Sequence, residues 1–237
     1  MIGNKEVVVM GYSDIEKGRI DHLIGPLNDV EKKYAASELF TTGNKELLKN
    51  RSVSVIGTRN PSQKGVQDAK IIAEFLVRSD IVVVSGLAKG IDTVAHKTAI
   101  ENGGKTIAVL GTPLDQCYPK ENEPLAQEIK KNHLAISQFE VGSKVFPSNF
   151  PKRNRTMALI SQASIIVEAG EKSGTMHQGW EALRLGRQLF ITEDLMKKDL
   201  SWTKKLVEYG AEVLYMDDLD VLLEFLPERL GAYCVTF

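Results

Sequence analysis

Cysteine is scarce in this chain. Only Cys117 and Cys234 occur among its 237 residues, far apart in the sequence. That number excludes a network of disulfides and a zinc site built on cysteines, and it is typical of a protein kept in a reducing compartment. The four histidines are scattered as well, so we expect no bound metal.

Long apolar runs are also missing. No stretch approaches the length of about 20 residues that a membrane-spanning helix needs, and the apolar run after Met1 is too short for a signal peptide. Positive and negative charges nearly cancel, at a net charge of −1, so no overall basic field attracts the chain to nucleic acid. We therefore expect a soluble, cytoplasmic protein without membrane contact, in which any nucleic-acid site is a local patch.

Familiar catalytic and nucleotide-binding motifs are absent too. The sequence contains no GxxxxGK[ST] loop, no GxGxxG fingerprint and no GxSxG nucleophile elbow. We therefore predict no catalytic residue and no cofactor.

The sequence does have a regular alternation of short Val/Ile-rich runs with amphipathic segments. Such runs are typical of strands buried on both faces, as in parallel sheets. Right-handed crossovers through the intervening helices would place helices on both faces. The pattern predicts an α/β fold with a doubly wound, mostly parallel sheet, which is an extended Rossmann-like fold. The predicted strands are residues 53–57, 81–86, 106–111, 134–139, 164–170, 188–192 and 211–216, with helices among others at 63–79, 93–102 and 176–185.

Three regions are predicted along the chain. Residues 1–50 are less regular and should form an extension packed on the core, with EVVVMG as a candidate strand and short helices at 29–37 and 45–49. Residues 51–226 should form the Rossmann-like domain. Residues 227–237 are an apolar tail, which either adds a strand or a subunit contact or simply packs on the core.

Four fragments combine small and basic residues: GTRNPSQKG from Gly57, SGLAKGID from Ser85, FPKRNR from Phe150 and SGT from Ser173. Three of them follow a predicted strand, and ligands of such sheets bind at the carboxyl ends of the strands. Small residues let backbone N–H groups approach an anion, and a helix N-terminus favours negative charge. Together the fragments predict one phosphate-binding rim.

The first two fragments each have a structural alternative. Arg59 points from its loop over the sheet edge, or it is a loop arginine tied to a carboxylate. In SGLAKGID, Lys89 is a cation at a strand end, and we assign Asp92 to capping the following helix. His96 lies on the same helical face as Asp92, and we assign it to packing or a hydrogen bond.

The last two fragments also allow two interpretations. FPKRNR is predicted as a basic turn before a helix over residues 156–162, and Phe146 and Phe150 beside it suit single-stranded nucleic acid, with cations on phosphates and rings on bases. The alternative is a solvated turn with both rings in the core. Arg153 and Arg155 should point in different directions, one into the pocket and the other toward an acid such as Glu168 or a subunit contact. The SGT fragment is either an anion-binding nest or a plain helix cap.

In order and spacing these fragments resemble the DNA-processing protein A (DprA/Smf) family. Besides the four fragments, the stretches VVSGLAKGIDTVAHKTAIENGGKTIAVLGTPLDQCYPKEN, LFTTGNKELLKN and EALRLGRQLFI carry the likeness, over roughly residues 36–218. The chain departs from the family pattern at Lys89, where arginine is common, at the Thr-Pro of LGTPLD, and in the helix after SGT, which reads MHQGWEAL instead of a small-residue stretch.

The resemblance implies a Rossmann-type protein that binds single-stranded DNA, protects it and loads RecA recombinase onto it during transformation, as a homodimer without established catalysis. By position, the implied DNA contacts are Arg59, Ser85, Gly86, Lys89, Phe150, Lys152, Arg153, Asn154 and Arg155, with Ser173, Gly174 and Thr175 lining the pocket and Gly57 and Gly90 completing the phosphate-binding set.

Two alternatives remain open at this point. One is a nucleotide sensor that binds a small nucleotide without turnover. The other is an enzyme similar to phosphoribohydrolases that act on nucleoside monophosphates through a PGGxGTxxE loop. Here the glutamate of that loop falls at Gln178, which cannot act as a general base, and Glu181 is a candidate substitute.

Overall fold

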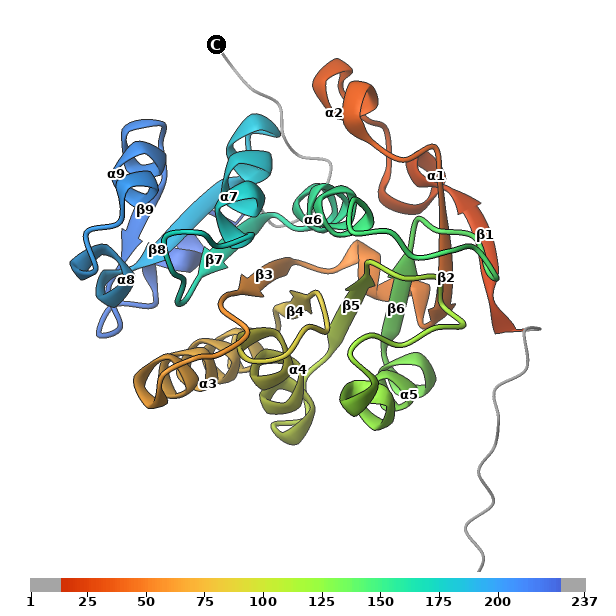
Figure 1. Ribbon diagram of the computed structural model, residues 1–237, viewed down its shortest axis with the longest axis horizontal. Coiled ribbons are helices and arrows are strands. Elements are labelled where there is room, and N and C mark those ends of the chain that lie inside the picture. Colours follow the sequence, from red (N-terminus) through yellow and green to blue (C-terminus); the bar gives the residue numbers. More distant parts are fainter. Residues whose placement is uncertain (1–13, 227–237) are drawn as a thin grey trace, which may run out of the picture.

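The computed structural model describes residues 14–226 and places a single nine-stranded sheet at their centre (Figure 1). The strand order is β1-β2-β6-β5-β4-β3-β7-β8-β9. The seven strands that run from β6 across the sheet to β9 are all parallel to their neighbours. At the other edge, β1 pairs antiparallel with β2, and β2 pairs antiparallel with β6. The strands are β1 Glu16–Arg19, β2 Glu38–Gly43, β3 Ser52–Ile56, β4 Val82–Ser85, β5 Thr106–Leu110, β6 Leu134–Ser137, β7 Ala163–Ile166, β8 Gln188–Thr192 and β9 Glu212–Leu214.

Helices cover both faces of the sheet, which confirms the predicted doubly wound α/β fold. Figure 1 shows α3, α4 and α5 on one side and α6, α7 and α9 on the other. Every residue of β3, β4, β5 and β7 is buried, because both faces of these strands lie under helices. The helices are α1 Ile20–Ile24, α2 Asp29–Tyr34, η2 Lys45–Lys49, α3 Gln63–Arg78, α4 Ile91–Glu101, η3 Lys120–Asn122, α5 Glu123–Asn132, α6 Asn149–Ile160, α7 Thr175–Arg184, α8 Glu193–Lys197, α9 Ser201–Glu208 and α10 Val221–Glu224.

The core divides into layers on the two sides of the sheet. One cluster joins apolar residues of β3, β4 and β5 to α6, α7 and α9, and a second joins the alternate residues of β3 and β4, with residues of β7, to α3 and α4. A smaller cluster lies under α5. The alternation follows from the strand period of two, which sends successive side chains to opposite faces.

Two features of the fold differ from the sequence-based expectation or add to it. Strands β1 and β2, which the sequence did not predict, extend the sheet at β6. The helix expected over residues 156–162 begins earlier, at Asn149, so FPKRNR lies within α6 and is not a turn. The short helices expected near residues 29–37 and 45–49 are confirmed.

Some predictions concern residues outside the described range. EVVVMG and the apolar tail lie outside residues 14–226, and the domain boundary at residue 50 stays a prediction. Within the described range, each helix is too short or too polar to cross a lipid bilayer. The same range contains no group of three or more His, Cys, Asp or Glu placed to hold a metal ion.

Candidate nucleic-acid interface

The site lies at the carboxyl edge of the sheet, where the chain order reverses. From β3 the chain proceeds outward through β4, β5 and β6, and it then crosses back to β7 on the other side of β3. Loops that follow neighbouring strands at such a switch point diverge and leave a crevice. A cavity of about 520 Å³ occupies this position between the loop after β3 and the loop after β7, and we call it the switch-point cavity. Its lining includes Gly57, Arg59, Phe150, Arg153, Asn154, Ser173, Gly174 and Thr175, all of them predicted site residues.

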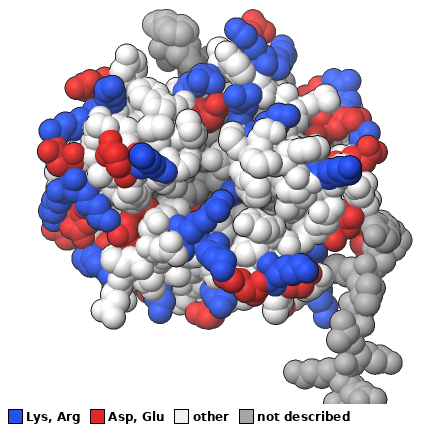
Figure 2. Space-filling model, in the orientation of Figure 1, with Lys and Arg blue, Asp and Glu red and all other residues white. Residues whose placement is uncertain are grey.

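Two further hollows continue the switch-point cavity along the surface. One measures about 40 Å³ and the other about 640 Å³, and Arg59 and Phe150 line all three. We call the three hollows together the groove. Figure 2 shows a short run of Lys and Arg side chains near the middle of the face that Figure 1 presents, while elsewhere on this face basic and acidic side chains alternate. A nearly neutral chain thus presents a local basic patch.

Aromatic rings line the far end of the groove. Tyr118 and Phe146 are 57% and 54% exposed, and the Tyr118 ring packs against Phe150 with centroids 5.9 Å apart. Phe146 therefore lies on the surface and not in the core, contrary to the structural alternative for this segment. Exposed rings beside cations are the surface that unpaired bases stack on.

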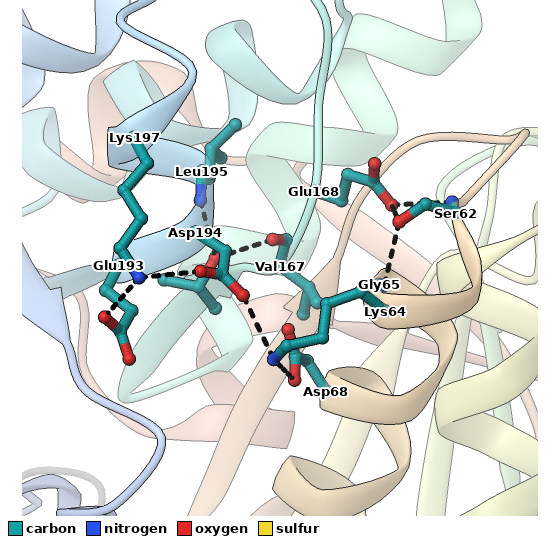
Figure 3. Close-up of polar contacts among 11 residues, drawn as sticks. Ser62, Lys64, Gly65, Asp68, Val167, Glu168, Glu193, Asp194, Leu195 and Lys197 are labelled. Atoms are coloured by element: carbon teal, nitrogen blue, oxygen red, sulfur yellow. Dashed lines mark hydrogen bonds and ion pairs between the residues drawn. The ribbon is translucent and has the colours of Figure 1, made fainter.

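Arg59 lies on a loop that is held at its far end by a polar network. The Glu168 carboxylate accepts hydrogen bonds from the Ser62 backbone N–H at 2.9 Å and from the Ser62 hydroxyl at 3.1 Å (Figure 3). It also pairs with Lys198 at 2.6 Å. Burial alone would raise the pKa of Glu168, but the hydrogen bonds from Lys198 and Ser62 hold it below its usual value. The Ser62 hydroxyl also caps α3 by accepting from Gly65 N–H at 3.0 Å.

A second part of the same network fixes the first turn of α3. The Lys64 ammonium pairs with Asp68 at 2.5 Å and with Asp194 of α8 at 3.0 Å (Figure 3). Arg59 itself is exposed and has no ion pair with any acid of residues 14–226. The structure therefore rules out the alternative in which Arg59 is tied to a carboxylate of these residues. Arg59 is an unpaired cation on an anchored loop.

Arg153 is buried beneath the groove. It is 6% exposed, lines the two hollows nearest the switch point, and donates from Nη1 to the Val109 carbonyl at 3.2 Å. Gly86 makes room for it, because a Cβ at Gly86 would lie 1.3 Å from Arg153 Nη1. Of the two arginines that were predicted to point in different directions, Arg153 is therefore the one that faces the pocket.

Asp92 is the charged neighbour of Arg153, and this corrects its predicted role as a helix cap. Its Oδ2 lies 4.0 Å from Arg153 Nη1 and accepts from the backbone N–H of Gly86 at 3.2 Å and of Ala88 at 3.4 Å. Gly90 is the residue at the N-cap of α4. Burial raises the pKa of the Asp92 carboxyl, while Arg153 and the two amides oppose that rise.

His96 has the structural role that was assigned to it. It is fully buried and its Nδ1 lies 2.7 Å from the Thr106 hydroxyl. Burial lowers the pKa of His96 to about 3. The ring is therefore neutral at physiological pH and takes no part in anion binding.

Arg155 turns away from the groove, toward α7. Its guanidinium makes two hydrogen bonds to the Glu181 carboxylate, at 3.0 and 3.1 Å, and lies 5.1 Å from the Tyr34 ring centroid. The partner is Glu181 and not Glu168, because Arg155 already lies inside α6 and faces the neighbouring helix. Arg184 also binds Glu181, at 3.1 Å, so Glu181 is not free to replace the glutamate of a phosphoribohydrolase loop.

We expect Arg155→Ala to lower the free energy of unfolding by about 1–3 kcal/mol, because it removes two charge-assisted hydrogen bonds and a ring contact. The loss should appear in urea unfolding at neutral pH. Affinity for single-stranded DNA should stay at the parent value. A variant with parental stability and weakened DNA binding would place Arg155 in the interface instead.

The other predicted residues fall into three groups. Gly86 and Lys89 line the groove, and Lys89 pairs with Glu121 at 2.5 Å on the exposed rim. Ser85 is fully buried and donates to the Val55 carbonyl at 2.6 Å, so the structure assigns it to the scaffold. The remaining residues lie outside the hollows: Gly90, whose φ of +76° requires glycine, the exposed Lys152, and Arg155.

The sequence-based prediction missed part of the lining. The loop after β5 contributes Thr112 and Tyr118, although the rule that ligands bind at strand ends would have selected it. The first turns of α7 contribute His177 and Gln178. Gln178 was weighed only as a misplaced glutamate, since no local pattern shows that its side chain is buried in the cavity wall.

A Rossmann-like sheet with a cavity at its switch point, lined by cations and a helix N-terminus, and with a basic, aromatic groove is typical of a polyanion-binding protein. The chain matches the family described as DNA recombination-mediator protein A over residues 26–226 and belongs to that family. It is 40% identical to DNA processing protein DprA of Streptococcus pneumoniae, over 83% of this chain and 70% of that protein. It is 34% identical to DNA processing protein DprA of Bacillus subtilis, over 84% and 67%.

Solved structures agree with this assignment. The X-ray structure of DNA processing protein A from Streptococcus pneumoniae superposes with a TM-score of 0.78 at 36% identity, over 90% of this chain and 75% of that one. DNA processing protein A from Helicobacter pylori, whose structure describes a single-stranded DNA binding mode, superposes with a TM-score of 0.77 at 27% identity, over 90% and 97%. The family's description is that of recombination mediators.

Proposed function

We propose that this protein binds single-stranded DNA along the groove. The observation that carries the proposal is the combination, in one continuous depression, of a free Arg59, a helix N-terminus at Ser173–Thr175 and exposed rings at Tyr118 and Phe146. Cations and backbone N–H groups bind phosphates, and rings stack on unpaired bases. A duplex hides its bases from such rings, so the groove favours a single strand.

We further propose the cellular role that the family implies. A protein that coats single strands in a sequence-tolerant way protects them and can pass them to RecA recombinase, in the cytoplasm, during transformation and recombination. A homodimer would present two grooves to one strand, which raises the effective concentration of the second site. The likeness to the Streptococcus pneumoniae and Helicobacter pylori proteins supports this role.

The test is a titration with a labelled single strand and with the same sequence as a duplex. We expect tighter binding of the single strand, with little dependence on its sequence. If about four phosphates are neutralised, log K against log salt should have a slope of about −3, at about −0.7 per phosphate. Equal affinity for both forms, or no response to salt, would contradict the proposal.

A further inference from the structure

Glu168 joins the two walls of the switch-point cavity. It lies just after β7, in the loop that forms one wall, yet its polar groups bond to the opposite wall, the loop after β3 that carries Arg59. The Glu168 carbonyl accepts from the Thr58 N–H at 2.7 Å. Its carboxylate accepts from the N–H and the hydroxyl of Ser62 at 2.9 and 3.1 Å (Figure 3). One residue thus holds the loop both before and after Arg59.

The wall that contains Glu168 is itself fixed to neighbouring elements. Lys198, between α8 and α9, pairs with the Glu168 carboxylate at 2.6 Å, and Trp202 of α9 donates from Nε1 to the Gly170 carbonyl at 3.3 Å. The first turn of α3 closes on the same carboxylate, because a Cβ at Gly65 would lie 2.0 Å from Glu168 Oε2. The carboxylate therefore lies where α3, the loop after β7 and the segment between α8 and α9 meet.

An acid at this place works against the ligand that the groove is proposed to bind. Glu168 is outside the lining of the three hollows, and it is ionised at neutral pH because its pKa lies below the usual value. Its charge therefore repels a polyanion through the cavity wall without contacting it. If this were its whole effect, removing the carboxylate would strengthen DNA binding. The bonds that the carboxylate makes indicate a role in geometry with the opposite outcome.

We propose that Glu168 is a positioning residue for DNA binding, which fixes Arg59 relative to the helix N-terminus at Thr175 on the facing wall. This inference rests on the proposed binding of single-stranded DNA. A strand contacts both walls with full affinity only if their spacing is set in advance, because ordering a loop on binding costs free energy. Loss of the carboxylate keeps the Thr58 attachment and releases the Ser62 end. Arg59 then keeps its charge and loses its fixed position.

The test replaces Glu168 by methionine, which is unbranched and offers no carboxylate acceptor. Glu168→Met should bind a labelled single strand about tenfold less tightly than the parent, a factor within the usual range for residues coupled through one hydrogen-bond network. The salt slope should become shallower by about 0.7, since Arg59 no longer neutralises its phosphate. Glu121→Met is the matched control, because it removes an acid at the groove rim that pairs with Lys89. It frees Lys89 for phosphate and should bind at least as tightly as the parent.

A double-mutant cycle with Arg59→Ala separates positioning from a general loss of stability. In the Arg59→Ala background, Glu168→Met should weaken binding by no more than about twofold, because the residue that it positions is gone, whereas independent effects would multiply. Glu168→Gln keeps an acceptor for Ser62 and should recover part of the affinity, and it replaces Glu168→Met in the cycle if that variant does not melt cooperatively. Parental or tighter binding by the Glu168 variant, or factors that multiply, would overturn the inference and leave single-stranded DNA binding in place. If the parent itself does not bind the single strand, the proposed function fails and the positioning role fails with it.

Discussion

Replacing Arg153 by methionine is expected to lower the free energy of unfolding by about 3–5 kcal/mol at neutral pH. Methionine keeps the unbranched stem, so the main change is loss of the guanidinium. The Asp92 carboxylate, 5% exposed and 4.0 Å from that guanidinium, then stays in the interior without its cation. The Val109 carbonyl also loses a donor. Urea unfolding of the parent and of Arg153→Met gives the difference.

The pH dependence of that difference identifies Asp92 as its origin. Burial raises the folded-state pKa of Asp92 above its ordinary value of 3.8, and removing Arg153 takes away the main group that opposes this rise. A carboxyl whose pKa is higher in the folded state favours folding below its unfolded pKa, and that contribution is lost as the pH rises through the folded pKa. The loss in free energy of unfolding caused by Arg153→Met should therefore be smaller at about pH 4.5 than at about pH 7.5.

Two further variants test the assignment. Asp92→Asn combined with Arg153→Met removes the stranded charge and keeps an acceptor for the Gly86 and Ala88 amides, so it should recover part of the lost stability and much of the pH dependence. Arg155→Met is the control variant. Its acid partner Glu181 has a side chain that is 12% exposed and that also pairs with Arg184. The stability that Arg155→Met loses should therefore not become smaller at the lower pH. An Arg153→Met deficit that is the same at both pH values would rule out Asp92 as the cause.

Arg59→Ala is expected to weaken single-stranded DNA binding by about 1.5–3 kcal/mol, which is the usual range for hydrogen bonds to a charged group. Arg59 lines all three hollows and has no competing ion pair in the described part of the chain, so its donors are free for phosphate. The salt slope should become shallower by about 0.7 for each phosphate that is no longer neutralised. Thermal stability should change by no more than about 0.5 kcal/mol, because the side chain is exposed.

Conservative and distant variants separate charge from geometry. Arg59→Lys keeps the charge and loses the planar fork, so it should retain the parental salt slope with part of the loss in affinity. Lys152→Ala removes an exposed cation outside the hollows, and it should cost less than Arg59→Ala. If Arg59→Ala binds single-stranded DNA like the parent at two salt concentrations, phosphates do not pass through this part of the groove.

The amino-acid sequence by itself determined the parallel part of the fold and the edge at which the site lies. Val/Ile runs such as 53–57 and 81–86 are local patterns whose burial on both faces follows from composition. The Gly57 and Ser173 fragments follow β3 and β7, and parallel strands send all their carboxyl ends to one edge. Both inferences need only neighbours in the sequence. The fold is confirmed, and the fragments line one cavity at that edge, while ligand binding there stays a prediction.

Only the tertiary structure decided which charges are free. In the sequence the three arginines at positions 59, 153 and 155 look equivalent. In the structure Arg153 is buried beside Asp92 and Arg155 is bound to Glu181, whereas Arg59 is exposed and has no ion pair within residues 14–226. The acids concerned are distant in the sequence, so no local pattern reveals them. The antiparallel strands β1 and β2 and the buried side chain of Gln178 were hidden for the same reason. Edge pairing and burial depend on which distant segments the chain brings together, and that is a property of the packed molecule.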